Sequence, residues 1–172
     1  MNIKELLQNK YAKETILTIR DWIGEDAEKF ATFMELFLQE DALMMQRAAW
    51  VLGHVGQVQP QLLLPYLSVF VQQLQRKDVH DAVKRNILRV LPEIEIPEEY
   101  QGELVIIGFD FLHSNETPAI KTFAMTMLYH ICLSQPELMP ELKQVIEERL
   151  PFESKAFQSR GRKILKGKRK LQ

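Results

Sequence analysis

The segment MMQRAAWVLGHVG, residues 44–56, carries the helical pattern on which the rest of the chain is built. Its apolar residues recur every three or four positions, which places them on one face of a helix. Similar segments follow it: RVLPEIE at 89–95, TMLYHIC at 126–132 and a degraded copy, KILKGKR, at 163–169. The anchor leucines of the four copies lie 39, 37 and 37 residues apart: Leu52, Leu91, Leu128 and Leu165. A helical unit that repeats at this period predicts a stack of helical hairpins.

The sequence predicts an all-α fold, because no segment alternates polar and apolar residues with the period of a β-strand. Asp41 can cap one helix with its carboxylate, and Pro118 suits the first turn of another. Pro65, five residues into its helix, should either kink that helix or mark its true first turn. We expect one domain over residues 1–167, an α–α superhelix of four to five hairpins, and a basic tail at 168–172. Ten helices are predicted: 2–9, 11–23, 26–39, 41–55, 60–75, 79–91, 98–113, 117–132, 136–150 and 153–167.

Each repeat has one apolar face that we expect to be buried. In 41–55 this face consists of Met44, Ala48, Val51, Leu52 and Val55. The corresponding residues of the next two copies are Val83, Ile87, Val90, Leu91 and Ile94, then Ile120, Ala124, Met127, Leu128 and Ile131. Burying one large aliphatic side chain contributes about 1.5–3 kcal/mol, so three such faces can align the stack. The helices 60–75 and 98–113 are apolar nearly all round, and we expect them to be covered on most sides.

The composition and the distribution of apolar residues argue against a secreted or membrane-spanning protein. Apolar residues make up 46% of the 172 residues and charged residues 26%, as in ordinary globular proteins. The start, MNIKELLQNK, has charges where a signal peptide needs an apolar core. The longest nearly apolar run, residues 62–71, is too short to span a bilayer. The single cysteine, Cys132, lies in an apolar helical stretch, so we expect a buried, reduced thiol. Because neither a signal peptide nor a membrane span is indicated, we expect a cytoplasmic location.

The chain resembles the HEAT-repeat family in its second helices. That family commonly shows Val-Arg-x-x-Ala-Ala-x-x-Leu-Gly-x-Ile-Gly, preceded by a loop aspartate. Residues 44–56 match this motif at Arg47, Ala48, Ala49, Leu52, Gly53, Val55 and Gly56. Residues 83–95 match at fewer positions, and 120–132 is a looser copy. The resemblance covers residues 11–167 and implies a right-handed superhelix whose second helices line the concave side.

The resemblance also implies that the positions between the core residues of the second helices form the concave surface. Basic residues gather in the middle of that surface, and the surface also carries one aromatic residue, Trp50. We predict that this surface binds a protein partner and that the protein is a non-catalytic scaffold. The predicted contact residues are Arg47, Trp50, His54, Lys84, Arg85, Arg89 and Lys121.

Two of these predictions have plain structural alternatives. Trp50 could be a flat apolar anchor with His54 as its polar rim, or it could pack against the preceding helix. Arg85 and Arg89 could clamp a carboxylate or phosphate. Alternatively, they could be solvated and pair with acidic residues along their own helix.

The net charge of −1 conceals a division of the chain. Residues 1–154 hold 14 Lys and Arg against 23 Asp and Glu, a balance of −9. Residues 155–172 hold eight basic residues and no acidic one, a balance of +8. This segment could bind nucleic acid, form a polar capping helix with a solvated tail, or contact the acidic body of a neighbouring molecule. The basic residues that could contact nucleic acid are Arg160, Arg162, Lys163, Lys166, Lys168, Arg169 and Lys170.

No catalytic or metal-binding constellation is visible in the sequence. The four histidines lack metal-ligand spacing, and the seven glycines are too scattered for a phosphate-binding loop. Some HEAT-like proteins are DNA glycosylases that excise alkylated bases, and the QRAA run with Arg47 resembles the segment that carries their arginine. Their essential aspartate has no counterpart, because Ala12 stands 35 residues before Arg47. We therefore predict no enzyme activity, cofactor, metal, membrane contact or small-molecule substrate.

Overall fold

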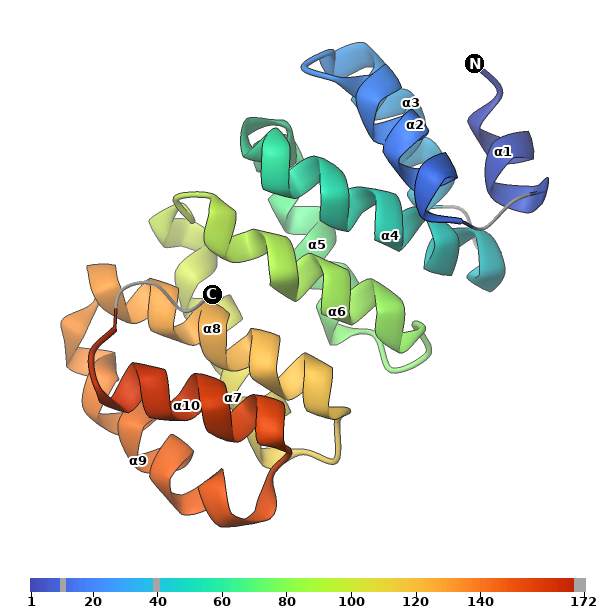
Figure 1. Ribbon diagram of the computed structural model, residues 1–172. Coiled ribbons are helices and arrows are strands. Elements are labelled where there is room, and N and C mark those ends of the chain that lie inside the picture. The colour runs from blue at the N-terminus through green and yellow to red at the C-terminus, as the bar shows by residue number, and fades with distance from the viewer. Residues whose placement is uncertain (10–11, 39–40, 169–172) are drawn as a thin grey trace. The chain divides into compact units, whose positions relative to one another are not determined.

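Figure 1 shows the computed structural model, which describes residues 1–9, 12–38 and 41–168. All regular elements in these residues are helical, which confirms the all-α fold class. The α-helices of this part are α1 (Ile3–Asn9), α2 (Lys13–Ile23), α3 (Ala27–Phe37), α4 (Ala42–Val58), α5 (Leu67–Gln75), α6 (Asp81–Val90), α7 (Glu98–His113), α8 (Pro118–Ser134), α9 (Met139–Arg149) and α10 (Lys155–Leu165). Short 3-10 helices adjoin them: η1 (Pro60–Tyr66), η2 (Leu91–Glu93), η3 (Pro136–Leu138) and η4 (Leu150–Phe152).

The chain divides into two compact units, Met1–Ile94 and Glu95–Gln172. In the first unit, α4 packs against α2, α3 and α6, and α5 packs against α6. In the second unit, α8 packs against α7, α9 and α10, and α9 packs against α10. Within each unit, the second helices of successive pairs therefore lie side by side, as Figure 1 shows for α4 and α6. These second helices are α2, α4 and α6 in the first unit and α8 and α10 in the second. The single domain over residues 1–167 stays a prediction.

Two helices begin where the sequence predicts a start. The carboxylate of Asp41 accepts hydrogen bonds from the backbone N–H groups of Leu43 and Met44, at 3.0 and 3.1 Å. These bonds satisfy two donors that have no partner inside α4. Pro118 is the first residue of α8, a position where its missing N–H costs nothing.

Pro65 marks a change of helix type. Residues 60–66, which the sequence predicts as part of one α-helix, form the 3-10 helix η1 instead. Proline has no N–H to donate and crowds the preceding turn, so a regular α-helix cannot run through this segment. The α-helix begins afterwards, at Leu67. The predicted helix 60–75 is therefore divided in two, and Pro65 lies near the end of its first part, η1.

The core of the first unit lies between α4 and its neighbours. The apolar face predicted for α4 is at most 3% exposed, and the corresponding face of the next copy is at most 6% exposed. Two glycines of α4 allow α6 to approach closely. A Cβ atom added at Gly56 would lie 2.6 Å from Cγ1 of Val90, and one at Gly53 would meet Oδ1 of Asn86. The two motif glycines of α4 are thus the points at which α4 and α6 meet.

The core of the second unit joins α7, α8, α9 and α10. The apolar face predicted for α8 is at most 1% exposed. A Cβ atom at Gly108 of α7 would lie 2.7 Å from Cγ of Leu128, so this pair of helices is also closely packed. The buried cluster contains Leu112, Met125, Leu128, Tyr129, Cys132, Leu142, Val145, Ile146, Phe157 and Ile164.

The helices 60–75 and 98–113 are less covered than their composition predicts. Leu64 is 44% exposed and Ile106 is 65% exposed. The prediction that these helices are enclosed on most sides is therefore wrong for their outer sides. A first helix of a hairpin needs to bury only the side that packs on its second helix, and the opposite side can face water.

Candidate functional site

Two rings lie together on the second helix α4 of the first unit. Trp50 and His54 are one turn apart, with ring centroids separated by 6.1 Å and planes inclined by 46°. Both side chains are half-buried. Gln57 follows three residues after His54, on the same side of the helix, and is exposed. The three side chains form a row along α4.

Cationic side chains of α2 and α6, which both pack against α4, bond to Gln57 or lower the pKa of His54. On α6, Nη2 of Arg89 donates to Oε1 of Gln57 at 3.0 Å, which places the guanidinium against α4. Burial lowers the pKa of His54, and the positive charges of Arg89 on α6 and of Arg20 and Lys13 on α2 lower this pKa further. The imidazole is therefore neutral near pH 7. We call the following residues the His54 cluster: Lys13, Arg20, Trp50, His54, Gln57 and Arg89.

The other basic residues predicted as contacts in the first unit differ in accessibility. Arg85 is exposed on α6. Lys84 is only 7% exposed, although the sequence predicts it on an accessible surface. Arg47 reaches α1, where its Nη1 donates to the backbone oxygens of Leu7 and Gln8 at 2.5 and 2.9 Å. A cation suits the unpaired carbonyls of a helix C-terminus, so Arg47 ties α1 to α4.

Lys121 belongs to the second unit and is 6% exposed. Its Nζ lies 2.9 Å from Oε1 of Glu153, and Nη2 of Arg149 lies 2.6 Å from the same oxygen. Burial raises the pKa of Glu153, but the hydrogen bonds from Lys121 and Arg149 outweigh this effect and the pKa is lowered overall. The sequence predicts Lys121 as a contact residue, whereas its observed partners tie α8 to the segment between α9 and α10.

The basic residues of the C-terminal segment lie on α10 and just after it. Nη1 of Arg160 donates to Oγ1 of Thr126 on α8 at 2.8 Å, and partial burial lowers the pKa of Arg160. Arg169 and Lys170 lie outside the described residues. The remaining predicted cations are exposed or half-buried: Arg162, Lys163, Lys166 and Lys168.

The apolar face of one repeat is buried again in the next two, and second helices lie side by side within each unit. The family model for the HEAT repeat domain matches residues 3–168. The chain belongs to the HEAT-repeat family. HEAT repeats generally mediate protein–protein interaction, and the family is typically non-enzymatic. No curated protein and no solved structure matches this HEAT-repeat chain.

Sequence reasoning missed three members of the His54 cluster: Lys13, Arg20 and Gln57. The first repeat departs from the HEAT motif, so α2 is recognisable only by its position. A signal was nevertheless present, because Lys13 and Arg20 are seven residues apart and thus lie on one side of the helix. Gln57 carries no such signal. Its role depends on Arg89, which is 32 residues away in the chain.

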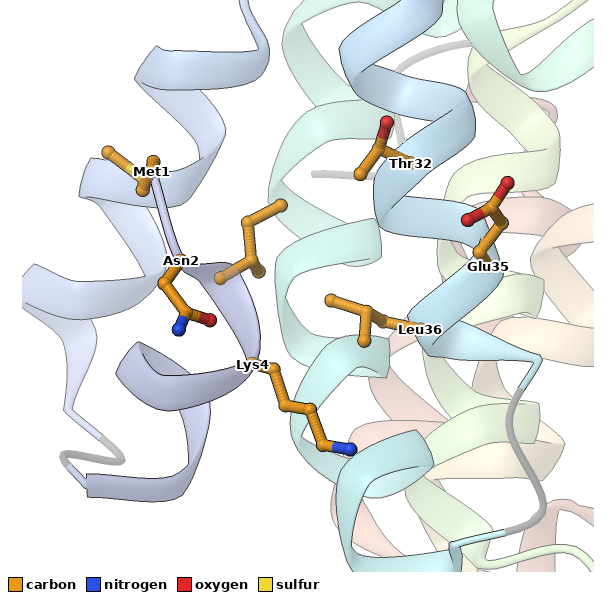
Figure 2. Close-up of a pocket in the computed structure, with 7 residues that line it drawn as sticks. Met1, Asn2, Lys4, Thr32, Glu35 and Leu36 are labelled. Carbon is orange, nitrogen blue, oxygen red and sulfur yellow. The ribbon is translucent and has the colours of Figure 1, made fainter.

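A cavity of about 530 Å³ lies between α1 and α3 of the first unit (Figure 2). It is lined by Met1, Asn2, Ile3, Lys4, Thr32, Glu35 and Leu36. Its polar lining residues are exposed, and the hydroxyl of Thr32 donates to the backbone oxygen of Glu28. A binding site for a small ligand needs a few fixed polar groups inside an apolar pocket. We therefore assign no ligand to this cavity.

Within the described part of the HEAT-repeat chain, no three His, Cys, Asp or Glu side chains are grouped so that they could hold a metal ion. No helix of this same part is long and apolar enough to cross a membrane. Burial and the negative charges of Glu137 and Glu141 raise the pKa of Cys132 to about 11, so its thiol is protonated near neutral pH.

Proposed function

We propose that this HEAT-repeat protein is a non-catalytic interaction module that binds a segment of a partner protein on the concave surface of its second helices. The general role of HEAT repeats in protein–protein interaction supports the broad assignment. The finer assignment is carried by the His54 cluster, in which the half-buried Trp50 lies beside His54 and the charges of three basic side chains lower the pKa of His54. Tryptophan and arginine are the residues that most often dominate the energy of an interface.

The proposed mechanism is the display of a surface that is already ordered before binding. The guanidinium of Arg89 is held by Gln57, and the rings of Trp50 and His54 lie together. The close approach at Gly56 fixes α4 against α6. A segment that docks on such fixed side chains loses less conformational entropy than one that must order its receptor.

The proposed contacts lie where side chains of α4 and α6 are exposed or half-buried: Trp50, His54, Arg85 and Arg89. Three further residues have contacts or burial within the chain: Arg47, Lys84 and Lys121. In this proposal Arg47 fixes α1 against α4, Lys84 is buried in α6, and Lys121 fixes α8 within the second unit.

Replacing Arg85 and Arg89 together by Glu tests the proposal. We expect this variant to lose capture of the partner, because two charges are reversed on the contact surface. A photo-crosslinking amino acid at position 50 would identify the partner by mass spectrometry. The control variant Arg76→Glu/Lys77→Glu changes the net charge equally in the exposed segment just after α5 and should retain capture. Unchanged capture by the Arg85/Arg89 variant would show that the partner binds elsewhere.

A second candidate function is nucleic-acid binding through the C-terminal segment. The observation that favours it is the exposure of Arg162, Lys166 and Lys168 in a segment without acidic residues. Each phosphate contact would add about 0.9 to the slope of log affinity against log salt on duplex DNA. Gel-shift titrations across salt, with these three residues replaced by Gln, would therefore show a shallower slope. Absent or salt-insensitive binding by the unaltered protein would remove this candidate.

We also propose that the protein acts in the cytoplasm. The support is the single cysteine, which has no partner for an intrachain disulfide and is buried as Cys132. Proteins of reducing compartments keep their thiols in this state. Fluorescence microscopy of the tagged protein would test the location.

A further inference from the structure

The His54 cluster brings an indole, a neutral imidazole and three cations together from three helices of the first unit. We propose that it recognises an acidic side chain, Asp or Glu, of an extended protein segment, while Trp50 covers the adjacent apolar part of that segment. This inference rests on the proposed function, because it names the chemistry of the segment that the second helices bind.

The arrangement of Arg89 and His54 suits a carboxylate. Arg89 donates one N–H to Gln57, and a guanidinium has five such donors. A neutral imidazole offers one further N–H. Gln57 lies three residues after His54, so the bond to Gln57 brings the guanidinium to the side of α4 on which the imidazole lies. A carboxylate between the two groups can accept charge-assisted bonds from Arg89 and a bond from His54.

The charges near His54 favour an anion. Among the described residues, the charged groups that shift the pKa of His54 are the cations Arg89, Arg20 and Lys13. Arg20 is partly neutralised by its neighbour Asp21, at 2.6 Å, whereas Arg89 is held by a neutral amide. Bringing an anion to this place offsets the mutual repulsion of the cations. It also favours protonation of the imidazole, so the pKa of His54 should rise on binding.

The surroundings of the cluster favour a protein segment over a nucleic acid. Exposed acidic residues adjoin its cations: Glu14 follows Lys13, Asp21 follows Arg20, and Glu93 lies one turn beyond Arg89. Duplex DNA carries one negative charge about every 1.7 Å along its axis, so it would meet these carboxylates as well as the cations. A protein segment can present one or two carboxylates with apolar residues beside them. The indole of Trp50 offers a surface for the apolar part.

Fluorescence of Trp50 provides the direct test. In the full chain with Trp22→Phe, the tryptophan emission comes from Trp50 alone, and a short poly-L-glutamate peptide serves as the probe. We expect titration with this peptide to change the emission in a saturable way. The substitution Arg89→Glu should weaken binding by about tenfold or more. The control Lys77→Glu makes the same change of net charge on an exposed residue outside the cluster and should leave the affinity unchanged.

The pKa of His54 is a second readout, which separates recognition of a carboxylate by the cluster from general electrostatic attraction. The pKa of His54, followed by NMR with and without saturating peptide, should rise in the unaltered protein and stay constant in the Arg89→Glu variant. Circular dichroism would establish that both variants remain folded. Equal loss of affinity in Arg89→Glu and Lys77→Glu, or a constant pKa of His54, would overturn the inference.

The outcomes also separate this inference from the proposed function. If the natural partner crosslinks at position 50 but poly-L-glutamate does not bind, the surface is an interface and the acidic specificity is wrong. If neither binds there, both proposals fail. If an oligonucleotide of deoxythymidine binds more tightly than poly-L-glutamate and Arg89→Glu abolishes that binding, the cluster recognises phosphate and the protein-segment inference is wrong.

Discussion

Glu153 shows how a buried charge can be kept ionised by two neighbours. Its side chain is 7% exposed, and both Lys121 and Arg149 bond the same oxygen. The sequence places Lys121 on a surface because its position lies between core residues of the repeat. The spacing could not reveal Glu153, which lies 32 residues later in the chain. A lysine that is buried in this way contributes to stability only while its partner is charged.

Removing Lys121 should therefore destabilise the fold in a pH-dependent manner. The pKa of Glu153 is lowered from its ordinary value of 4.5, so the ion pair stabilises the fold above that value and is lost as pH falls through the folded pKa. We expect Lys121→Met to cost about 2 kcal/mol of unfolding free energy at neutral pH, because Arg149 still compensates part of the charge. Urea denaturation should show this deficit shrinking in acid, and the exposed control Lys155→Met should show no deficit. An equal deficit at both pH values would contradict this account.

Cys132 should resist modification in the folded protein. Burial and nearby negative charges raise its pKa to about 11, and the thiolate is the reactive form. We expect a thiol reagent at mildly alkaline pH to modify Cys132 only after denaturant is added. Rapid labelling of the native protein would show that the second unit opens around α8.

At the scale of elements, the glycines of α4 decide how close α6 can come. A Cβ atom at Gly56 would lie 2.6 and 2.8 Å from two carbon atoms of Val90, whose branched side chain has few alternative rotamers. The exposed Gly102 of α7 has no such neighbour within 4 Å. The two glycines therefore form a matched pair, in which one is required by packing and the other is not.

Alanine at these two positions should have opposite effects on stability. Gly56→Ala gains helix propensity but overpacks the contact with Val90, so we expect a net loss of about 1–2 kcal/mol. Gly102→Ala gains propensity without a clash and should stabilise the fold by about 0.5–1 kcal/mol. Thermal unfolding followed by circular dichroism measures both. A stabilised Gly56→Ala protein would show that the two helices can separate without cost.

The helices themselves could largely be predicted because the signals that start and stop them are local. Asp41 caps α4 through donors two and three residues away, and Pro118 acts at its own position. The 3-10 segment η1 could not be placed from the sequence, since Pro65 allowed either a kink or a new start. Exposure of Ile106 was also missed, because composition alone does not tell which sides of a helix are covered.

At the scale of the whole molecule, the division into two units makes a prediction about folding. The stability of a repeat protein is roughly a sum of repeat terms and nearest-neighbour terms. Residues 1–94 contain their own buried core, so we expect this fragment to be helical and to unfold cooperatively at a lower temperature than the full chain. Circular dichroism of the fragment measures both properties. A fragment without a cooperative transition would instead favour the single domain predicted over residues 1–167.

The sequence by itself determined the helical class, the repeat family and the buried faces, because apolar spacing and capping act over a few residues within one helix. Only the tertiary structure decided which polar residues meet. Arg47 reaches the end of α1, Arg89 reaches Gln57, and Lys121 reaches Glu153. Each of these contacts joins residues more than 30 positions apart in the chain. These contacts form only where neighbouring helices pack closely enough. Glycines and branched side chains set that distance through contacts between helices, which the residue pattern within one helix does not show.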